Sequence, residues 1–233
     1  MIETPLGTEF RLGPCRIFFG NKNSQILTLK NAEPRLKFLR LKQIHSALIH
    51  DVDASTPDYQ IEGDALITKE AGLALCSITA DCVPVLVFCA ESRMISAIHS
   101  GWRGVAARLV PLTLERMKEK GANPNHMHIW MGPHILKKSF EVERDVCEKI
   151  LASASLSLES PAEDFNIKEN GRYNIDLAKI LLRQISEFSI SSSQIQLLAR
   201  DTKTDLSYHS ARRDRELSGR QISWISLSSA PTF

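Results

Sequence analysis

Residues 73–89, "LALCSITADCVPVLVFC", decide the fold class, together with "MISAIH" at 94–99. Both stretches are apolar and rich in β-branched residues, which is typical of buried strands. "SGWRG" (100–104) follows directly, and from 105 to 120 apolar residues recur at roughly helical spacing until Gly121. We therefore expect buried strands followed by a helix, with Pro111 either kinking that helix or delaying its start.

The same alternation continues along the chain. Apolar residues at helical spacing predict helices at 142–150 and 177–188, the second with Asn174 or Asp176 as its N-cap. Further strands are predicted at "HIWMG" (128–132), "IQLLA" (195–199) and "ISWISL" (222–227), and a surface loop at 152–166. Strands interleaved with helices indicate an α/β or α+β fold, and we expect residues 1–233 to form a single domain.

Composition narrows the class of protein. The chain has 233 residues, of which 43% are hydrophobic and 24% charged, as in soluble globular proteins with a substantial core. A net charge of +2 gives no reason to expect a nucleic-acid or membrane partner. Residues 1–13 lack the order of a signal peptide, and no apolar run has the length of a membrane span, so we expect a cytoplasmic protein. Five cysteines without a CxxC pair indicate reduced thiols.

Three separate segments combine reactive side chains with apolar surroundings: "KQIHSA", "ITADCVPVLVF" and "AIHSGWRG". They contain His45, Cys82 and His99. Neutral imidazoles and a thiolate are good zinc ligands, and three protein ligands with an open position are typical of catalytic zinc. No single helix or loop holds the three residues together, however, so the residues alone favour a buried thiol and hydrogen-bonded core histidines.

Arg103 is a second candidate. It lies at the start of the predicted helix between Gly101 and Gly104, which allow close approach of the backbone. A guanidinium beside helix-terminal N–H groups can bind phosphate or carboxylate. Alternatively, Arg103 pairs with a surface carboxylate. We expect Trp102 to be a structural wedge in the core.

Carboxylates near these segments have two interpretations. Asp64, in "EGDALIT", is either a proton-transfer group or a turn residue, and Glu141 is a weaker candidate for proton transfer. Asp81 would face away from Cys82 on a regular strand, so we interpret Asp81 as structural unless a bend re-aims it.

Other reactive residues are given structural roles or no role. "GPHILKKSFEVERDV" contains His134, for which no role is assigned. Arg212, Arg213 and Arg220, in "HSARRDRELSGR", are interpreted as a solvated, salt-bridged face. The remaining cysteines are interpreted as core thiols: Cys15, Cys76, Cys89 and Cys147.

Seven motifs occur in an order that resembles a known family. They are "QIH" (43–45), "GDALIT" (63–68), "TADCVPVL" (79–86), "AIHSGWRG" (97–104), "GPHI" (132–135), "FEV" (140–142) and "SARRDRELSGRQ" (210–221). From residue 36 onward the chain looks like the laccase-domain family, also called the multicopper polyphenol oxidase domain or YfiH-like proteins. The order of several separated motifs is more specific than any one of them.

This resemblance implies a single-domain, mixed-sheet α/β sandwich with α/β/β/α layers and a pocket beside the sheet. It implies zinc-associated phosphorolysis of adenosine, inosine and methylthioadenosine with phosphate, and deamination of adenosine as a companion activity. By position, His45, Cys82 and His99 match the family's metal ligands and are implied to be catalytic. Arg103, with Gly101 and Gly104, matches the family's HAGWRG, where phosphate would bind.

The chain departs from the family pattern at three places. Family members usually have a longer amino-terminal region, with a glycine-rich stretch that supplies another pocket arginine. Here "CRIFFGNKNSQ" (15–25) takes its place, and that role is not assigned to Arg16. Ser100 replaces the usual alanine, and Asp201 replaces the cysteine before Thr202. These differences concern the substrate and not the metal ligands.

Two further catalytic hypotheses remain open. A copper-dependent polyphenol oxidase is one, because two histidines and a cysteine also bind blue copper. Seven histidines are few for a multicopper array, and the only HxH pair is His126 and His128. A hydrolase with Cys82 as nucleophile and His45 or His99 as base is the other. A non-catalytic binding protein is also compatible with the shortened amino-terminal region.

Overall fold

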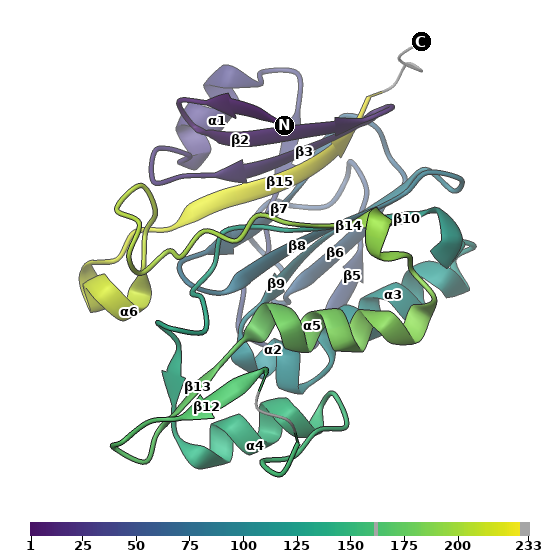
Figure 1. The fold of residues 1–233 in the computed structure, drawn as a ribbon. Coiled ribbons are helices and arrows are strands. Elements are labelled where there is room, and N and C mark those ends of the chain that lie inside the picture. Colours follow the sequence, from purple (N-terminus) through teal and green to yellow (C-terminus); the bar gives the residue numbers. More distant parts are fainter. Residues whose placement is uncertain (161–162, 229–233) are drawn as a thin grey trace.

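Two six-stranded sheets stack face to face in the computed structural model, which describes residues 1–160 and 163–228 (Figure 1). The first sheet has the order β1 (Ile2–Thr4), β2 (Gly7–Leu12), β3 (Cys15–Gly20), β15 (Gln221–Leu227), β7 (Leu73–Thr79), β4 (Lys37–Leu39). The second has the order β14 (Ile195–Leu197), β10 (Met127–Met131), β8 (Val83–Cys89), β9 (Met94–Ser100), β6 (Ala65–Thr68), β5 (Ile49–Asp51). A small third sheet contains β11 (Glu141–Val142), β13 (Tyr173–Ile175) and β12 (Phe165–Ile167).

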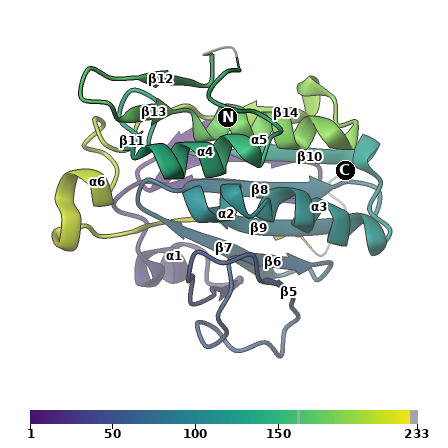
Figure 2. The same ribbon diagram turned by 90° about the horizontal axis from the view of Figure 1, so that it is seen from below.

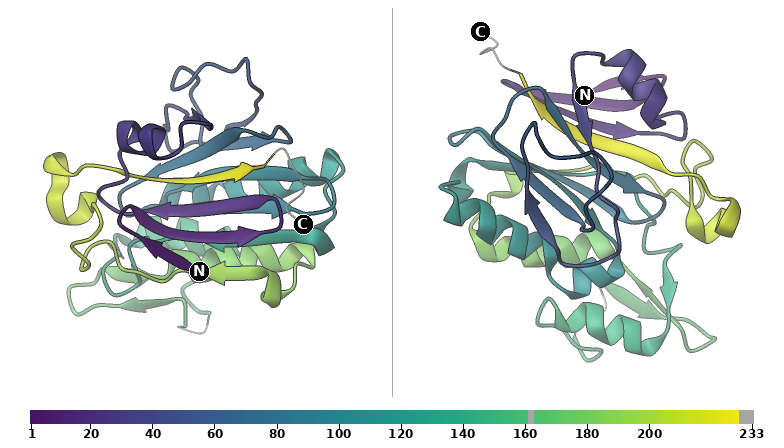
Figure 3. Two further views of the ribbon diagram at one scale, coloured as in Figure 1. Left: turned by 90° about the horizontal axis from the view of Figure 1, so that it is seen from above. Right: turned by 180° about the vertical axis from the view of Figure 1, so that it is seen from behind.

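Helices cover the outer faces of both sheets. α1 (Ile26–Ala32) lies on the first sheet, whereas α2 (Trp102–Ala106), α3 (Leu109–Glu119) and α5 (Leu177–Ile185) cover the second, with α4 (Arg144–Ala152) and the third sheet beyond them (Figures 1 and 2). α6 (Ala211–Asp214) projects at one end of the sandwich (Figure 3). Single 3₁₀ turns are η1 (Pro124–His126), η2 (Ser186–Phe188), η3 (Ser192–Gln194) and η4 (Arg215–Leu217). The predicted mixed-sheet sandwich with α/β/β/α layers is therefore confirmed, while the assignment of one domain to 1–233 stays a prediction.

Side-chain alternation on β8 explains why this strand reads as one continuous apolar run. Val83, Val85 and Val87 pack toward the helices, whereas Leu86 and Phe88 pack between the two sheets. Successive side chains of a strand point to opposite faces, and here both faces are covered. The strands predicted at 73–89 and 94–99 are thus β7, β8 and β9, and the remaining predicted strands are also present.

The predicted helix at 105–120 is wrong in its boundaries. Helical structure begins earlier, at Trp102, and Arg108 then adopts a left-handed conformation (φ 58°) that separates α2 from α3. Pro111 is the third residue of α3. Because the first-turn N–H groups of a helix have no intrahelical partner, proline is tolerated there. Of the two expected effects of Pro111, a kink or a later helix start, the structure shows the later start, because α3 begins at Leu109.

The other helix predictions are confirmed. α4 and α5 coincide with the expected segments, and the Asp176 side chain caps α5 by accepting a hydrogen bond from the Lys179 N–H (3.1 Å). The loop expected at 152–166 includes residues 161–162, which lie outside the described residues. Among the residues described, no helix combines the length and the apolar character needed to cross a bilayer.

His134 is buried on the segment that follows β10. Its Nδ1 donates to the Gly132 carbonyl (2.7 Å), and its Nε2 is buried without a hydrogen-bond partner. Burial lowers the pKa of His134, although the Gly132 carbonyl and two aspartates oppose that effect. The side chain belongs to the core and is not one of the groups that line the cavity described below.

A pH-dependent loss of stability is expected from His134. Below the ordinary pKa of about 6.5, the unfolded chain binds a proton that the folded protein does not bind, so stability falls as the pH falls. The excess stability of the wild type over His134→Asn should shrink by up to about 1.4 kcal/mol per pH unit below pH 6.5. Urea unfolding at pH 5–8 measures this difference. The exposed residue His126 supplies the control, His126→Asn. A constant difference for His134→Asn would contradict the prediction.

Candidate functional site

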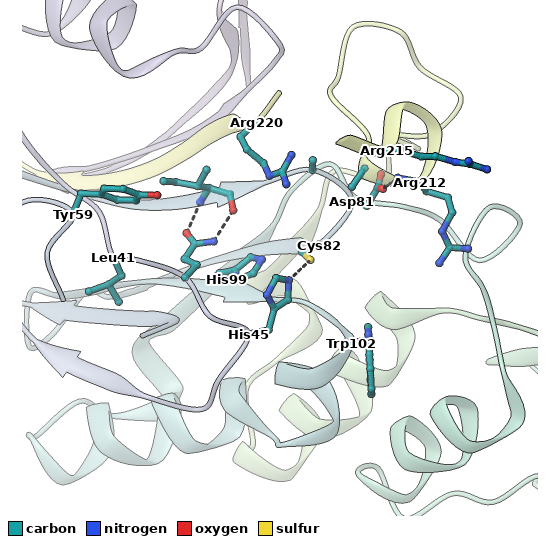
Figure 4. A pocket seen from close by; sticks show the side chains of 14 residues that line it. Leu41, His45, Tyr59, Asp81, Cys82, His99, Trp102, Arg212, Arg215 and Arg220 are labelled. Carbon is teal, nitrogen blue, oxygen red and sulfur yellow. Dashed lines mark hydrogen bonds between the residues drawn. The ribbon is translucent and has the colours of Figure 1, made fainter. Parts of the chain in front are cut away.

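A cavity of about 640 Å³ opens where the two sheets end beside α6 (Figure 4). It lies among the 41–45 loop, the β7–β8 turn, the end of β9 and the segment that leads into β15. The residues that line it are Leu41, Gln43, His45, Tyr59, Ile78, Ala80, Asp81, Cys82, His99, Trp102, Ala211, Arg212, Arg215 and Arg220. The cavity therefore collects residues that are far apart in the sequence.

The structure brings His45, Cys82 and His99 together in this cavity. One ligand atom from each residue lies within 4.8 Å of the others. The Cys82 Sγ is 3.8 Å from the His45 Nε2, and the two imidazole rings meet edge to face with centroids 4.8 Å apart. His45 is exposed, Cys82 is half-buried and His99 is buried, so the cluster is reachable from one side.

Local backbone geometry makes this approach possible. His45 adopts a left-handed conformation (φ 59°), which is uncommon for a non-glycine residue. The nearby Gln43 side chain accepts from the Ile78 N–H (2.8 Å) and donates to the Ile78 carbonyl (2.6 Å), which fixes the loop against β7. A Cβ on Gly101 would lie 2.8 Å from the Cys82 sulfur and 2.9 Å from the His45 ring, so this position requires glycine.

Asp64 lies behind the histidines and not in the cavity lining. Its carboxylate accepts from the His99 Nδ1 (2.8 Å), the His45 N–H (3.1 Å), and the N–H and hydroxyl of Ser46 (2.6 Å each). Burial would raise the pKa of Asp64, but the bonds to His99 and Ser46 lower it. The carboxylate is thus held ionised, and both of its oxygens accept hydrogen bonds from neighbouring residues. The Nδ1 contact leaves Nε2 as the His99 nitrogen available to a ligand.

Cys82 and His99 form a charge-coupled pair. Burial by itself would raise the pKa of Cys82, but His99 and His45 outweigh burial and lower that pKa to about 6. Burial would likewise lower the pKa of His99, but the Cys82 thiolate and Asp64 raise it to about 9. Thiolate is the form of cysteine that binds metals and acts as a nucleophile.

Asp81 occupies the bend between β7 and β8. Its φ of 87° breaks the strand, so Asp81 and Cys82 both line the cavity. Its carboxylate nevertheless accepts from the Thr202 hydroxyl (2.6 Å) and the Arg212 N–H (2.7 Å). The expectation that Asp81 faces away from Cys82 is therefore wrong, because the bend turns both residues to the cavity. The hydrogen bonds of Asp81 hold Thr202 and Arg212 at the cavity.

The basic run near the carboxyl terminus is only partly a salt-bridged face. Arg213 pairs with Asp214 and donates to the carbonyls of neighbouring residues, as expected. Arg212, Arg215 and Arg220, in contrast, line the cavity, and all three side chains are exposed. Arg215 received no role from the sequence. The signal for it was present in the "SARRDRELSGRQ" motif, but the residues alone do not show which arginines face inward.

Arg103 is not one of the residues that line the cavity. Its guanidinium stacks 4.5 Å from the centre of the Trp102 ring, and neither Arg103 nor Gly104 lines the cavity, whereas Trp102 does. Gly104 packs beside Leu109. α2 is too short, at five residues, to offer a helix-terminal anion site of its own. Of the proposed phosphate-binding group, only Gly101 adjoins the metal-ligand cluster.

Two other candidates also lie outside the cavity lining. Glu141 is bound by Lys168 and by Arg172 (3.2 Å) on the third sheet. Arg16 is paired with Glu9 and Glu33 on the first sheet, consistent with assigning it no pocket role. Among the described residues, Asp81 is therefore the one carboxylate that lines the cavity.

Comparison with known proteins places the chain in a family. A family model described as "Multi-copper polyphenol oxidoreductase laccase" matches residues 21–228. A protein of Bacteroides thetaiotaomicron named purine nucleoside phosphorylase is 40% identical over 166 residues, which cover 70% of this chain and 60% of that protein. A protein of the same name from Deinococcus radiodurans is 31% identical over 190 residues, covering 82% of this chain and 70% of that protein.

Solved structures show the same fold. The crystal structure of the Bacillus licheniformis hypothetical protein YfiH superposes with a TM-score of 0.82 at 22% identity, covering 92% of this chain and 93% of that chain. YlmD from Geobacillus stearothermophilus gives a TM-score of 0.78 at 23% identity, covering 96% and 99% of the two chains. The chain belongs to the multi-copper polyphenol oxidoreductase laccase family.

Proposed function

We propose that this chain is a purine nucleoside phosphorylase. The observation that carries the proposal is the His45–Cys82–His99 cluster in a cavity with three exposed arginines (Figure 4). The names of the curated relatives give the same activity for those proteins. Adenosine, inosine and methylthioadenosine are the proposed nucleosides, with inorganic phosphate as the second substrate.

The metal-ligand cluster fits zinc by its chemistry. Zinc accepts two imidazoles and one thiolate and leaves a further position open in catalytic sites. Asp64 orients His99 as the carboxylate partner of a metal-bound histidine commonly does. A zinc ion held there would supply Lewis-acid character and could also support deamination of adenosine, which we propose as a companion activity.

Phosphate binding is better explained by the cavity arginines than by Arg103. Guanidinium groups form strong, charge-assisted hydrogen bonds with phosphate. Arg212 is also positioned by its backbone bond to Asp81 and by donation of its side chain to the Glu141 carbonyl (2.8 Å). We propose that Arg212, Arg215 and Arg220 hold the phosphate dianion in the cavity.

The reaction balances without a carboxylic acid from the protein. A phosphate oxygen forms a bond to C1′ of the ribose while the bond from C1′ to the purine nitrogen breaks. The hydrogen phosphate dianion loses one proton and the departing purine gains one. Asp64 and Glu141 therefore need not donate a proton. We propose instead that Asp64 positions the two histidines.

A single preparation tests the proposed function. Protein purified without added metal is analysed for zinc and copper, then incubated with adenosine or inosine while phosphate is varied. Release of adenine or hypoxanthine together with ribose 1-phosphate, dependent on phosphate, is expected. Absence of purine release with zinc-loaded protein at all phosphate concentrations would overturn the proposal.

The assignment of phosphate to the cavity arginines and its assignment to Arg103 predict different effects of substitutions on the KM for phosphate. Arg215→Gln should raise the KM for phosphate about 10- to 100-fold, because a charged hydrogen bond contributes roughly 1.5–3 kcal/mol. Arg103→Gln should change the KM much less, because its guanidinium lies on Trp102 outside the cavity lining. Initial rates at saturating nucleoside measure both. The reverse ranking of the two variants would restore Arg103 as the phosphate ligand.

Two alternatives make distinct predictions. Copper-dependent phenol oxidation would use the same three ligands, but within residues 1–160 and 163–228 this is the one group of three potential ligands. A hydrolase would use the thiolate character of Cys82, and its metal-free form should then retain activity. Phenol oxidation with added copper, and activity after chelation, are the respective measurements.

A further inference from the structure

The cavity has two chemically different ends, with the metal-ligand cluster between them. Figure 4 shows Leu41 and Tyr59 on one side of the cluster and Arg212 and Arg215 on the other. Ile78 also lines the cavity, and its backbone polar groups are satisfied by the Gln43 amide. The end with Leu41 and Tyr59 is therefore aromatic and apolar. The opposite end carries the cations Arg212 and Arg215 together with Trp102, and Arg220 lies above the cluster between the two ends.

Tyr59 is held as a fixed platform at the apolar end. Its N–H donates to the Arg40 carbonyl (2.8 Å), and the Arg40 guanidinium lies 5.0 Å from the centre of its ring. The Asp58 carboxylate accepts from both the Nε (3.0 Å) and the NH2 (2.8 Å) of Arg40. These contacts fix the guanidinium behind the ring. Tyr59 still keeps 49% of its surface exposed and contributes to the cavity lining.

We propose that the apolar end is the base subsite, in which the purine ring stacks on Tyr59 beside Leu41 and Ile78. This inference rests on the proposed function. A purine has two broad apolar faces, and aromatic side chains bind such faces by stacking. Nucleophile and leaving group occupy opposite sides of the reacting carbon in a direct displacement. A cavity with Arg212 and Arg215 at one end and Tyr59 at the other, and with Arg220 between them, provides that arrangement across the cluster.

The test compares Tyr59→Ala with Tyr59→Phe and with a control outside the cavity. Loss of one stacking partner should raise the KM for adenosine about tenfold while kcat and the KM for phosphate change little. Tyr59→Phe keeps the ring and should restore the KM to within about twofold. Leu112→Ala removes a comparably exposed side chain, at 46%, from α3 and should have no effect.

Direct binding separates this inference from the proposed function. Adenine is titrated into zinc-loaded wild type and Tyr59→Ala by calorimetry, and the dissociation constant should rise about tenfold in the variant. If wild-type phosphorolysis occurs but neither the KM nor adenine binding responds to Tyr59→Ala, the base subsite is wrong and the function stands. If phosphorolysis is absent, the function fails, and adenine binding that depends on Tyr59 still supports the subsite. Absence of adenine binding to the wild type would overturn the proposed base subsite.

Discussion

Cys82→Ala is expected to lose bound zinc and to lower kcat/KM by about 10³-fold. The variant removes the thiolate from the proposed three-ligand zinc site, where a bound zinc ion would stabilise developing charge by several kcal/mol. Cys82 is half-buried in the cavity, so the core should remain folded. Metal analysis after gel filtration and steady-state phosphorolysis measure the two effects, and circular dichroism checks the fold.

A matched cysteine provides the control for this variant. Cys147 is buried on α4, in the core between the helices and the second sheet. Cys147→Ala should lower the stability but keep the zinc content and kcat. Full activity and full metal content in Cys82→Ala would remove Cys82 from the site. Loss of activity with zinc retained would favour the nucleophile hypothesis instead.

Asp64→Asn is expected to weaken zinc binding by about 10- to 100-fold, the usual effect of removing a partner of a metal-bound histidine. The carboxylate accepts four hydrogen bonds, including those from His99 and the His45 backbone. An amide offers a single acceptor oxygen, so at least one of these donors must lose its partner. Competition with a chromogenic zinc chelator measures the affinity.

Saturating zinc distinguishes positioning from proton transfer at Asp64. If Asp64 positions the histidines, excess zinc should restore most of kcat in Asp64→Asn. A general acid would leave kcat low at all zinc concentrations. Asp145→Asn, which removes an exposed carboxylate paired with Lys149 on α4, serves as the control and should bind zinc normally.

Local sequence patterns predicted most of the fold. The buried strands β7, β8 and β9 have apolar residues on both faces, so their composition alone identifies them. Asp176 likewise identifies the start of α5 because capping depends on neighbouring residues only. The break at Arg108 was not predicted, since a left-handed arginine leaves no compositional signal comparable to that of glycine.

The chemistry of the residues suggested the candidate site, but only the resemblance favoured it over a buried thiol and core histidines. His45 and Cys82 are 37 residues apart, and no local rule places such residues in contact. The resemblance decided in favour of that grouping, yet it did not show that the Asp64 carboxylate accepts hydrogen bonds from His99, His45 and Ser46. It also assigned phosphate to Arg103, and that assignment stays a prediction. The motif does not show that the Arg103 guanidinium stacks on Trp102. Only the tertiary structure shows that Arg215 and Tyr59 line the cavity.

The central position of β15 has a consequence for the order of assembly. β15 lies between β3 and β7, so the hairpins β1–β2–β3 cannot join β7 until residues 221–227 have been synthesised. The potential metal ligands lie at 45–99, whereas the cavity arginines lie at 212–220, directly before β15. During translation His45, Cys82 and His99 therefore leave the ribosome well before the cavity arginines. Closure of the first sheet and completion of the cavity therefore both depend on residues 212–227.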